Sequence, residues 1–105
     1  VCSSDLSGPA YVFLFLQAMI DGGQALGLSA EQSRSLALAT FAGATRLAAE
    51  SPESPATLRE RVTSKGGTTA AALAVMQSRD MPDIVAEAMR AAAARAQAMG
   101  QEFAG

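Results

Sequence analysis

The chain has 105 residues, of which 50% are hydrophobic and 5% aromatic, and its net charge is −2 at pH 7. This length predicts one domain or part of a larger protein, and the absence of a basic cluster argues against nucleic-acid binding. With no histidine, a single cysteine (Cys2) and no grouped carboxylates, the sequence predicts no metal site and no internal disulfide, which is typical of a reducing, cytoplasmic compartment.

Hydrophobic residues recur with helical spacing along the chain, and no stretch keeps the alternation of a strand. The pattern therefore predicts an all-α fold. Pro9 suits the first turn of the first helix, and Gly27 suits the position after its end. The expected N-caps are Ser29 (in a capping box with Gln32), Ser54 and Asp80. The predicted helices are Pro9–Leu26, Ala30–Glu50, Pro55–Val62, Thr68–Ser78 and Pro82–Phe103.

The first two predicted helices are apolar around most of their circumference. Residues 11–16 are consecutive apolar residues that cannot share one face, and Leu36 and Leu38 lie on different sides of the second helix. The first apolar run is shorter than the ~20 residues that a membrane span needs, and no basic segment precedes it as in a signal peptide. A helix that is apolar nearly all round must be surrounded by other helices. We therefore expect an interlocked homodimer; a monomer with exposed apolar surface is the alternative.

The candidate for chemistry is the segment Val62–Thr69, which reads VTSKGGTT. Its glycine pair permits positive φ, and the helix start that follows presents unpaired N–H groups and the positive end of a dipole. Ser64 and Thr69 add hydroxyls, and Gly67, Thr68 and Thr69 add backbone N–H groups. The segment predicts a small site for a carboxylate or phosphate; a tight turn with a helix cap is the alternative. It is neither a P-loop nor a dinucleotide fingerprint.

Other polar and apolar residues are expected to be structural. Glu50 and Glu53 flank a proline-bracketed hinge and are expected to be solvated. Along the fifth helix, Ile84 and Met99 are expected to face inward.

Three motifs, in order and spacing, resemble the C-terminal dimerisation domain of pyrroline-5-carboxylate reductase. The motifs are Ser7-Gly8-Pro9-Ala10-Tyr11, Asp21-Gly22-Gly23 followed by Gly27-Leu28, and Leu58-Arg59 followed by Val62–Thr69. The last motif is the most specific, and the resemblance covers nearly everything from Ser7 onward. Lys65 stands where proline is common in the family, which leaves a role for Lys65 open.

The resemblance implies a five-helix, all-α domain that forms an interlocked helical dimer, or a higher homo-oligomer, like the C-terminal domain of 6-phosphogluconate dehydrogenase-like reductases. It implies a full-length enzyme that reduces pyrroline-5-carboxylate to L-proline with NADPH or NADH, held mainly by an N-terminal Rossmann domain that is missing here. Ser64, Gly67, Thr68 and Thr69 would bind the substrate carboxylate. The Thr69 hydroxyl would approach the ring nitrogen and serve catalysis, and the fragment alone would be inactive.

Other interpretations of domain organisation and function stay open. We expect residues 1–6 to be a disordered or non-native start, and residues 7–105 to form the helical dimerisation and substrate-binding domain. The chain could instead be a stand-alone helical interaction module whose Gly-Gly loop is only a turn. A different dehydrogenase with a similar helical domain is a third possibility, against which the complete Ser64–Thr69 motif argues.

Overall fold

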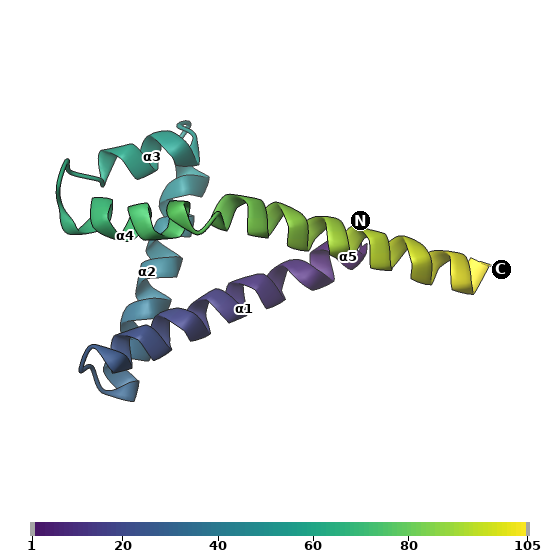
Figure 1. Cartoon of the computed structure of the whole chain (residues 1–105), viewed down its shortest axis with the longest axis horizontal. Helices are drawn as coiled ribbons and strands as arrows, with labels where there is room; N and C mark the ends of the chain where they lie inside the picture. Colours follow the sequence, from purple (N-terminus) through teal and green to yellow (C-terminus); the bar gives the residue numbers. More distant parts are fainter. Residues whose placement is uncertain (1, 105) are drawn as a thin grey trace. The chain divides into compact units, whose positions relative to one another are not determined.

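The computed structural model describes residues 2–104, and the side chains of residues 8–100. Within those residues every regular element is a helix, which confirms the predicted all-α fold (Figure 1). The helices are α1 (Cys2–Ala25), α2 (Ala30–Glu50), α3 (Pro55–Arg61), α4 (Thr68–Ser78) and α5 (Met81–Ala104). The chain divides into two compact units, one formed by Ala10–Arg61 and the other by Val62–Gly105 together with Val1–Pro9.

Helix α1 begins earlier than the sequence predicts. Pro9 lies inside the helix, which starts at Cys2, so the expected start at Pro9 is wrong. The fixed φ of proline is itself helical, so the helix continues through Pro9 at the cost of one backbone hydrogen bond and of crowding against the carbonyl of the preceding turn. The other end agrees with the prediction: Gly27 has φ +111°, and Leu28 N–H donates to the Gly23 carbonyl oxygen at 3.1 Å. These features are those of a Schellman cap.

Small residues bring α1 and α2 close together within the first unit. The Ser33 hydroxyl donates to the Ile20 carbonyl oxygen at 2.7 Å, and a Cβ added to Gly23 would collide with the Ser33 Oγ. Ser33 and Ala37 are the only buried residues among those whose side chains are described, at 3% and 2% exposure. Further along, the rings of Phe15 and Phe41 meet edge to face with centroids 5.4 Å apart. The contact is narrow, and α1 and α2 diverge away from it (Figure 1).

The starts of α2 and α3 follow from local sequence. Before α2, the Ser29 Oγ accepts from Gln32 N–H at 3.1 Å, while the Gln32 side chain accepts from Ser29 N–H at 3.2 Å. This confirms the predicted capping box. Ser54 caps α3 as predicted, because its Oγ accepts from Thr57 N–H at 3.2 Å. Each interaction satisfies an N–H group that the first helical turn leaves unpaired.

In the second unit, α4 leads into α5 through a short break (Figure 1). Arg79 N–H donates to the Val75 carbonyl oxygen at 3.2 Å and so closes α4. Asp80 lies directly before α5, and its carbonyl oxygen accepts from Ile84 N–H at 2.9 Å. Its φ of +61° is in the left-handed region that Asp tolerates, instead of the extended region usual for an N-cap.

The single chain leaves many large apolar side chains exposed. Ile84 and Met99, which were expected to face inward, are 57% and 41% exposed, so that expectation is not met by this chain alone. On α1 and α2 the exposed side chains lie on several sides of each helix, as the sequence predicts. The exposed large apolar residues of these two helices are Tyr11, Val12, Phe13, Leu14, Leu36, Leu38 and Leu47. A helix pair of this composition therefore lacks cover for most of its apolar surface.

Candidate anion-binding site

A tight turn precedes α4 and involves the glycine pair of the VTSKGGTT segment. Gly67 N–H donates to the Ser64 carbonyl oxygen at 3.0 Å, and Gly66 has φ +74°. A positive φ at the third residue of a four-residue turn is the mark of a type II turn, and it favours glycine. The segment therefore reverses direction where the sequence predicts that it does.

Gly67, unlike Gly66, is favoured because another residue approaches its backbone closely. Its φ of −87° is accessible to any residue, but a Cβ there would collide with the Ser64 Oγ and lie 3.2 Å from the Ser64 carbonyl oxygen. The Ser64 side chain therefore lies directly against the backbone of Gly67, which is the N-cap of α4. This arrangement brings a hydroxyl group to the start of a helix without using it as a cap.

The start of α4 has free donors. Gly67 offers no side chain to cap the helix, and the first helical bond runs from Ala71 N–H to the Gly67 carbonyl oxygen at 3.1 Å. Within the part of the chain that the structure describes, no protein atom accepts from the N–H groups of Thr68, Thr69 or Ala70. Such groups, with the positive end of the helix dipole, favour an anion.

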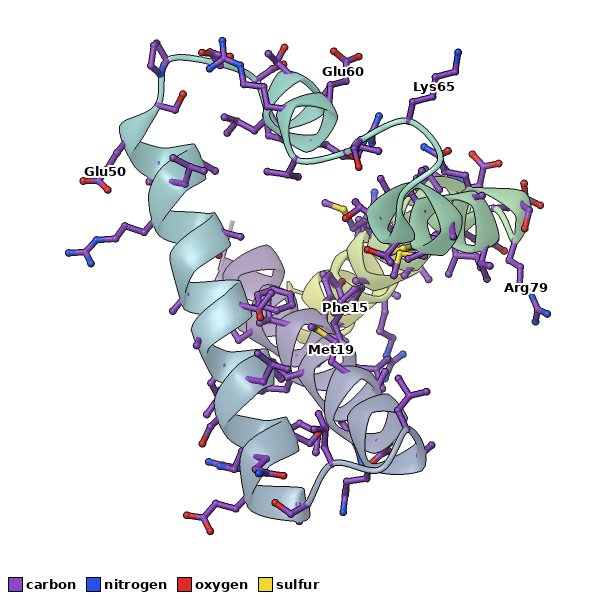
Figure 2. All side chains as sticks on the ribbon, turned by 90° about the vertical axis from the view of Figure 1, so that its left-hand side faces the viewer. Phe15, Met19, Glu50, Glu60, Lys65 and Arg79 are labelled. Atoms are coloured by element: carbon purple, nitrogen blue, oxygen red, sulfur yellow. The ribbon has the colours of Figure 1, made fainter. Side chains whose placement is uncertain are left out.

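The four residues predicted for the site lie together at this helix start. Ser64 and Thr68 are exposed, while Gly67 and Thr69 are half-buried. The Thr69 hydroxyl makes no hydrogen bond among the described residues, so it is available to a ligand. Lys65 is exposed, and its side chain projects outward from the turn (Figure 2). The charged end of the Lys65 side chain therefore takes no part in the hydrogen bonds of the turn.

Other kinds of site find no support in the described residues. They contain no group of three or more His, Cys, Asp or Glu side chains arranged to hold a metal ion. None of the described helices is long and apolar enough to cross a bilayer. A dinucleotide site of the Rossmann type needs a strand before its glycine-rich turn, whereas the Ser64–Gly67 turn follows the short helix α3. The described residues therefore do not form a dinucleotide site of the Rossmann type by themselves.

One polar contact of the described residues has no counterpart in the sequence-based expectations. Glu53, expected to be solvated, is half-buried, and its Oε1 accepts from the Arg61 Nη1 at 2.6 Å. The prediction that the Glu53 side chain is solvated is therefore wrong. The two residues are eight positions apart, a spacing that matches no helical neighbour pair. Only opposite charges flanking a short helix could have pointed to this pair.

Comparison with known proteins identifies relatives of this chain. A model of the family described as pyrroline-5-carboxylate reductase dimerisation matches residues 4–99. The pyrroline-5-carboxylate reductase of Pseudomonas aeruginosa is 45% identical over 97 residues, which cover 92% of this chain and 36% of that protein. The enzyme of Vibrio alginolyticus is 47% identical over 98 residues, with the same coverage of 92% and 36%.

Solved structures give the same result. The crystal structure of Plasmodium falciparum pyrroline carboxylate reductase with NADP bound matches with a TM-score of 0.90 and 35% identity, over 93% of this chain and 39% of that one. The structure of a pyrroline-5-carboxylate reductase from Coxiella burnetii matches with a TM-score of 0.84 and 41% identity, over 87% and 34%.

The helices and the loop define an all-α domain with an open helix start behind a Gly-Gly turn. The chain belongs to the pyrroline-5-carboxylate reductase dimerisation family. It spans 36% of the length of the curated relatives described above.

Proposed function

We propose that this chain is the helical, substrate-binding part of a pyrroline-5-carboxylate reductase, which reduces pyrroline-5-carboxylate to L-proline with NADPH or NADH. The observation that carries the proposal is the turn at Ser64–Gly67 and the free N–H groups that follow it. The substrate is a small cyclic imine with one carboxylate. A helix start with two nearby hydroxyls offers donors of the number and kind that such a carboxylate needs.

Different groups of the loop bind different parts of the substrate in this proposal. Ser64, together with the backbone N–H groups of Gly67, Thr68 and Thr69, belongs to the proposed carboxylate site; of these, the Thr68 and Thr69 groups have no protein acceptor among the described residues. The Thr69 hydroxyl meets the ring nitrogen, orients the C=N bond and supports protonation of the nitrogen. Fixing the imine in one orientation lowers the barrier mainly through positioning. No general base is needed, which suits a chain without histidine.

The cofactor belongs to another part of the enzyme in this proposal. The nicotinamide ring supplies the hydride, and a dinucleotide-binding domain outside this chain holds it. The described residues contribute the floor of the substrate site and the contacts between subunits. We place the enzyme in the cytoplasm, because this chain has a single cysteine and so forms no disulfide within itself.

The assembly in this proposal is a homodimer in which the helices of two chains cover one another. Exposed apolar residues lie on several sides of α1 and α2, and a shallow hollow between these helices has apolar and polar lining. The lining residues are Phe13, Leu16, Gln17, Ile20, Arg34 and Leu38. A second copy of the chain supplies the missing cover, since large exposed apolar patches mark interfaces. The family description as a dimerisation domain supports this part of the proposal.

Steady-state kinetics of the full-length reductase that carries this chain test the loop. We expect Thr69→Ala to lower kcat/KM roughly 10- to 100-fold, because one change removes a contact that both holds and orients the imine. Ser64→Ala should mainly raise KM, by roughly 10-fold, because Ser64 contacts only the carboxylate, and a hydrogen bond to a charged group is worth about 1.5–3 kcal/mol. The proposed roles are wrong if Thr69→Ala keeps near-normal kcat/KM while Ser64→Ala lowers kcat.

A further inference from the structure

The backbone of Gly67 has the conformation of an N-cap residue that carries a capping side chain. Its φ of −87° and ψ of −177° are close to the φ of −69° and ψ of 161° of Ser29, whose Oγ accepts from Gln32 N–H at the start of α2. A side chain on Gly67 would therefore point toward the N–H groups of the first turn of α4, as the side chain of Ser29 does in α2.

The Ser64 hydroxyl lies where the side chain of Gly67 would begin. A Cβ added to Gly67 would collide with the Ser64 Oγ and lie 3.7 Å from the Ser64 Cβ. Among the described residues the Ser64 hydroxyl makes no hydrogen bond, and the N–H groups of the first turn of α4 have no acceptor. A hydroxyl and free N–H groups thus meet at one helix start without bonding to one another, and both can donate to the same anion.

A Cβ at position 67 would displace this hydroxyl more than it would displace the backbone. The Ser64 Oγ is the end of a short side chain, and rotation about χ1 moves it away from an added Cβ. The Ser64 carbonyl oxygen would be 3.2 Å from the same Cβ, a crowded contact that a small shift relieves. The absence of a side chain on Gly67 therefore decides mainly where the Ser64 hydroxyl lies.

We propose that Gly67 is a positioning residue for the anion-binding site: because it has no side chain, the Ser64 hydroxyl can lie at the uncapped start of α4 and meet the substrate carboxylate there. The proposal rests on the function proposed above. This role is separate from that of the Gly67 N–H group, which donates to the Ser64 carbonyl oxygen at 3.0 Å. All of these residues lie in one compact unit, the one that contains Val62–Gly105.

Steady-state kinetics of the full-length reductase test whether Gly67 acts through Ser64. We expect Gly67→Ala to raise KM for pyrroline-5-carboxylate roughly 3- to 10-fold, with kcat and the KM for the nicotinamide cofactor changed less than about twofold. In a Ser64→Ala background the same substitution should change KM less than about twofold, because the hydroxyl that it displaces is already absent. Gly100→Ala is the control without an expected change, since an added Cβ there has nothing within 4 Å. An equal rise of KM in both backgrounds overturns the proposal.

Ser29→Ala separates positioning from a loss of stability. It also places alanine at the N-cap of a helix, and it removes a complete capping box, so it should lower the melting temperature at least as much as Gly67→Ala does. Its KM for pyrroline-5-carboxylate should stay within about twofold of that of the unchanged protein. If Ser29→Ala and Gly67→Ala raise KM alike, KM follows stability, the role of Gly67 is merely structural and the proposal is overturned.

Crystal structures of the unchanged protein and of Gly67→Ala distinguish a failure of this proposal from a failure of the proposed function. In the variant we expect the Ser64 Oγ to have rotated away from the start of α4, while the Ser64–Gly67 turn is retained. If the Oγ keeps its position, the proposal is overturned whatever the kinetics show. If the unchanged protein does not reduce pyrroline-5-carboxylate, the proposed function fails, and the crystal structures alone decide whether Gly67 positions the Ser64 hydroxyl.

Discussion

Lys65 occupies a backbone position that suits proline. It is the first central residue of the Ser64–Gly67 turn, in which Gly66 has φ +74°. Proline is favoured at this position of a type II turn because its fixed φ matches the turn. Among the described residues, neither the backbone N–H nor the side chain of Lys65 has a partner. Proline would therefore break no hydrogen bond there.

We predict that Lys65→Pro stabilises the protein by about 0.4–1 kcal/mol, because proline restricts the unfolded chain without straining the folded one. The value of kcat/KM should stay within roughly twofold, since the proposed contacts to the substrate come from Ser64 and the residues after Gly66. Thermal melting and steady-state kinetics of the full-length protein measure both effects. Lys65→Gln removes the charge alone; a large loss of activity in both variants would show that the Lys65 cation takes part in binding.

At the scale of elements, the contact between α1 and α2 depends on the absence of a side chain at one position. A Cβ on Gly23 would collide with the Ser33 Oγ and lie 3.2 Å from the Ser33 Cβ. The neighbouring Gly22 has nothing within 4 Å of such a Cβ. Two adjacent glycines of one helix thus differ in their surroundings, and they form a matched pair for an experiment.

We predict that Gly23→Ala destabilises the protein by about 1–3 kcal/mol, because the added methyl group forces α1 and α2 apart or displaces the Ser33 hydroxyl from Ile20. Gly22→Ala should be neutral or stabilising by up to about 1 kcal/mol, because alanine is the better helix former. Thermal unfolding followed by circular dichroism measures both. Equal effects of the two substitutions would contradict the close approach, and Ser33→Ala should relieve part of the cost of Gly23→Ala.

At the scale of the whole molecule, the exposed apolar side chains of α1 and α2 predict a partner chain. Phe13 and Leu14 are 66% and 68% exposed in the single chain, although they follow one another along the same helix. A side chain that is mostly exposed contributes little to the stability of its own chain. Such large apolar residues can contribute to stability if a second chain covers them, which would account for their presence.

We predict a homodimer with little stable monomer, so that its melting temperature rises with protein concentration. Analytical ultracentrifugation at micromolar concentration should give the dimer mass. Phe13→Glu should weaken the dimer strongly, whereas Glu50→Gln, at an exposed end of α2, should leave it unchanged. A well-folded monomer of the unchanged chain at these concentrations would refute the prediction.

The activity of the isolated chain gives a further prediction. Because its described residues provide no dinucleotide site, the purified 105-residue chain should not oxidise NADPH or NADH in the presence of pyrroline-5-carboxylate. Fusion of the chain to the part of the Pseudomonas aeruginosa relative that lies outside the matched segment should restore activity. Measurable turnover by the chain alone would show that a cofactor site exists within it.

The sequence by itself determined features that depend on neighbours along the chain. The capping box of Ser29 and Gln32, the cap at Ser54 and the Gly27 turn are all local hydrogen-bond patterns, and each agrees with its prediction. The Ser64–Gly67 turn belongs to the same class, since Gly66 takes the positive φ that a glycine pair permits. Local geometry and periodicity therefore gave the element order and the position of the candidate site.

Only the tertiary structure decided features that join residues from different turns or different helices. The Glu53–Arg61 pair, the close approach of Ser33 to Gly23 and the edge-to-face rings of Phe15 and Phe41 have no periodic signal in the sequence. The start of α1 before Pro9 also escaped prediction, because proline suits the first turn of a helix and the Ser, Asp and Gly residues before it are weak helix formers. Local rules fix where a helix is capped, whereas the distance between two side chains depends on how the helices pack.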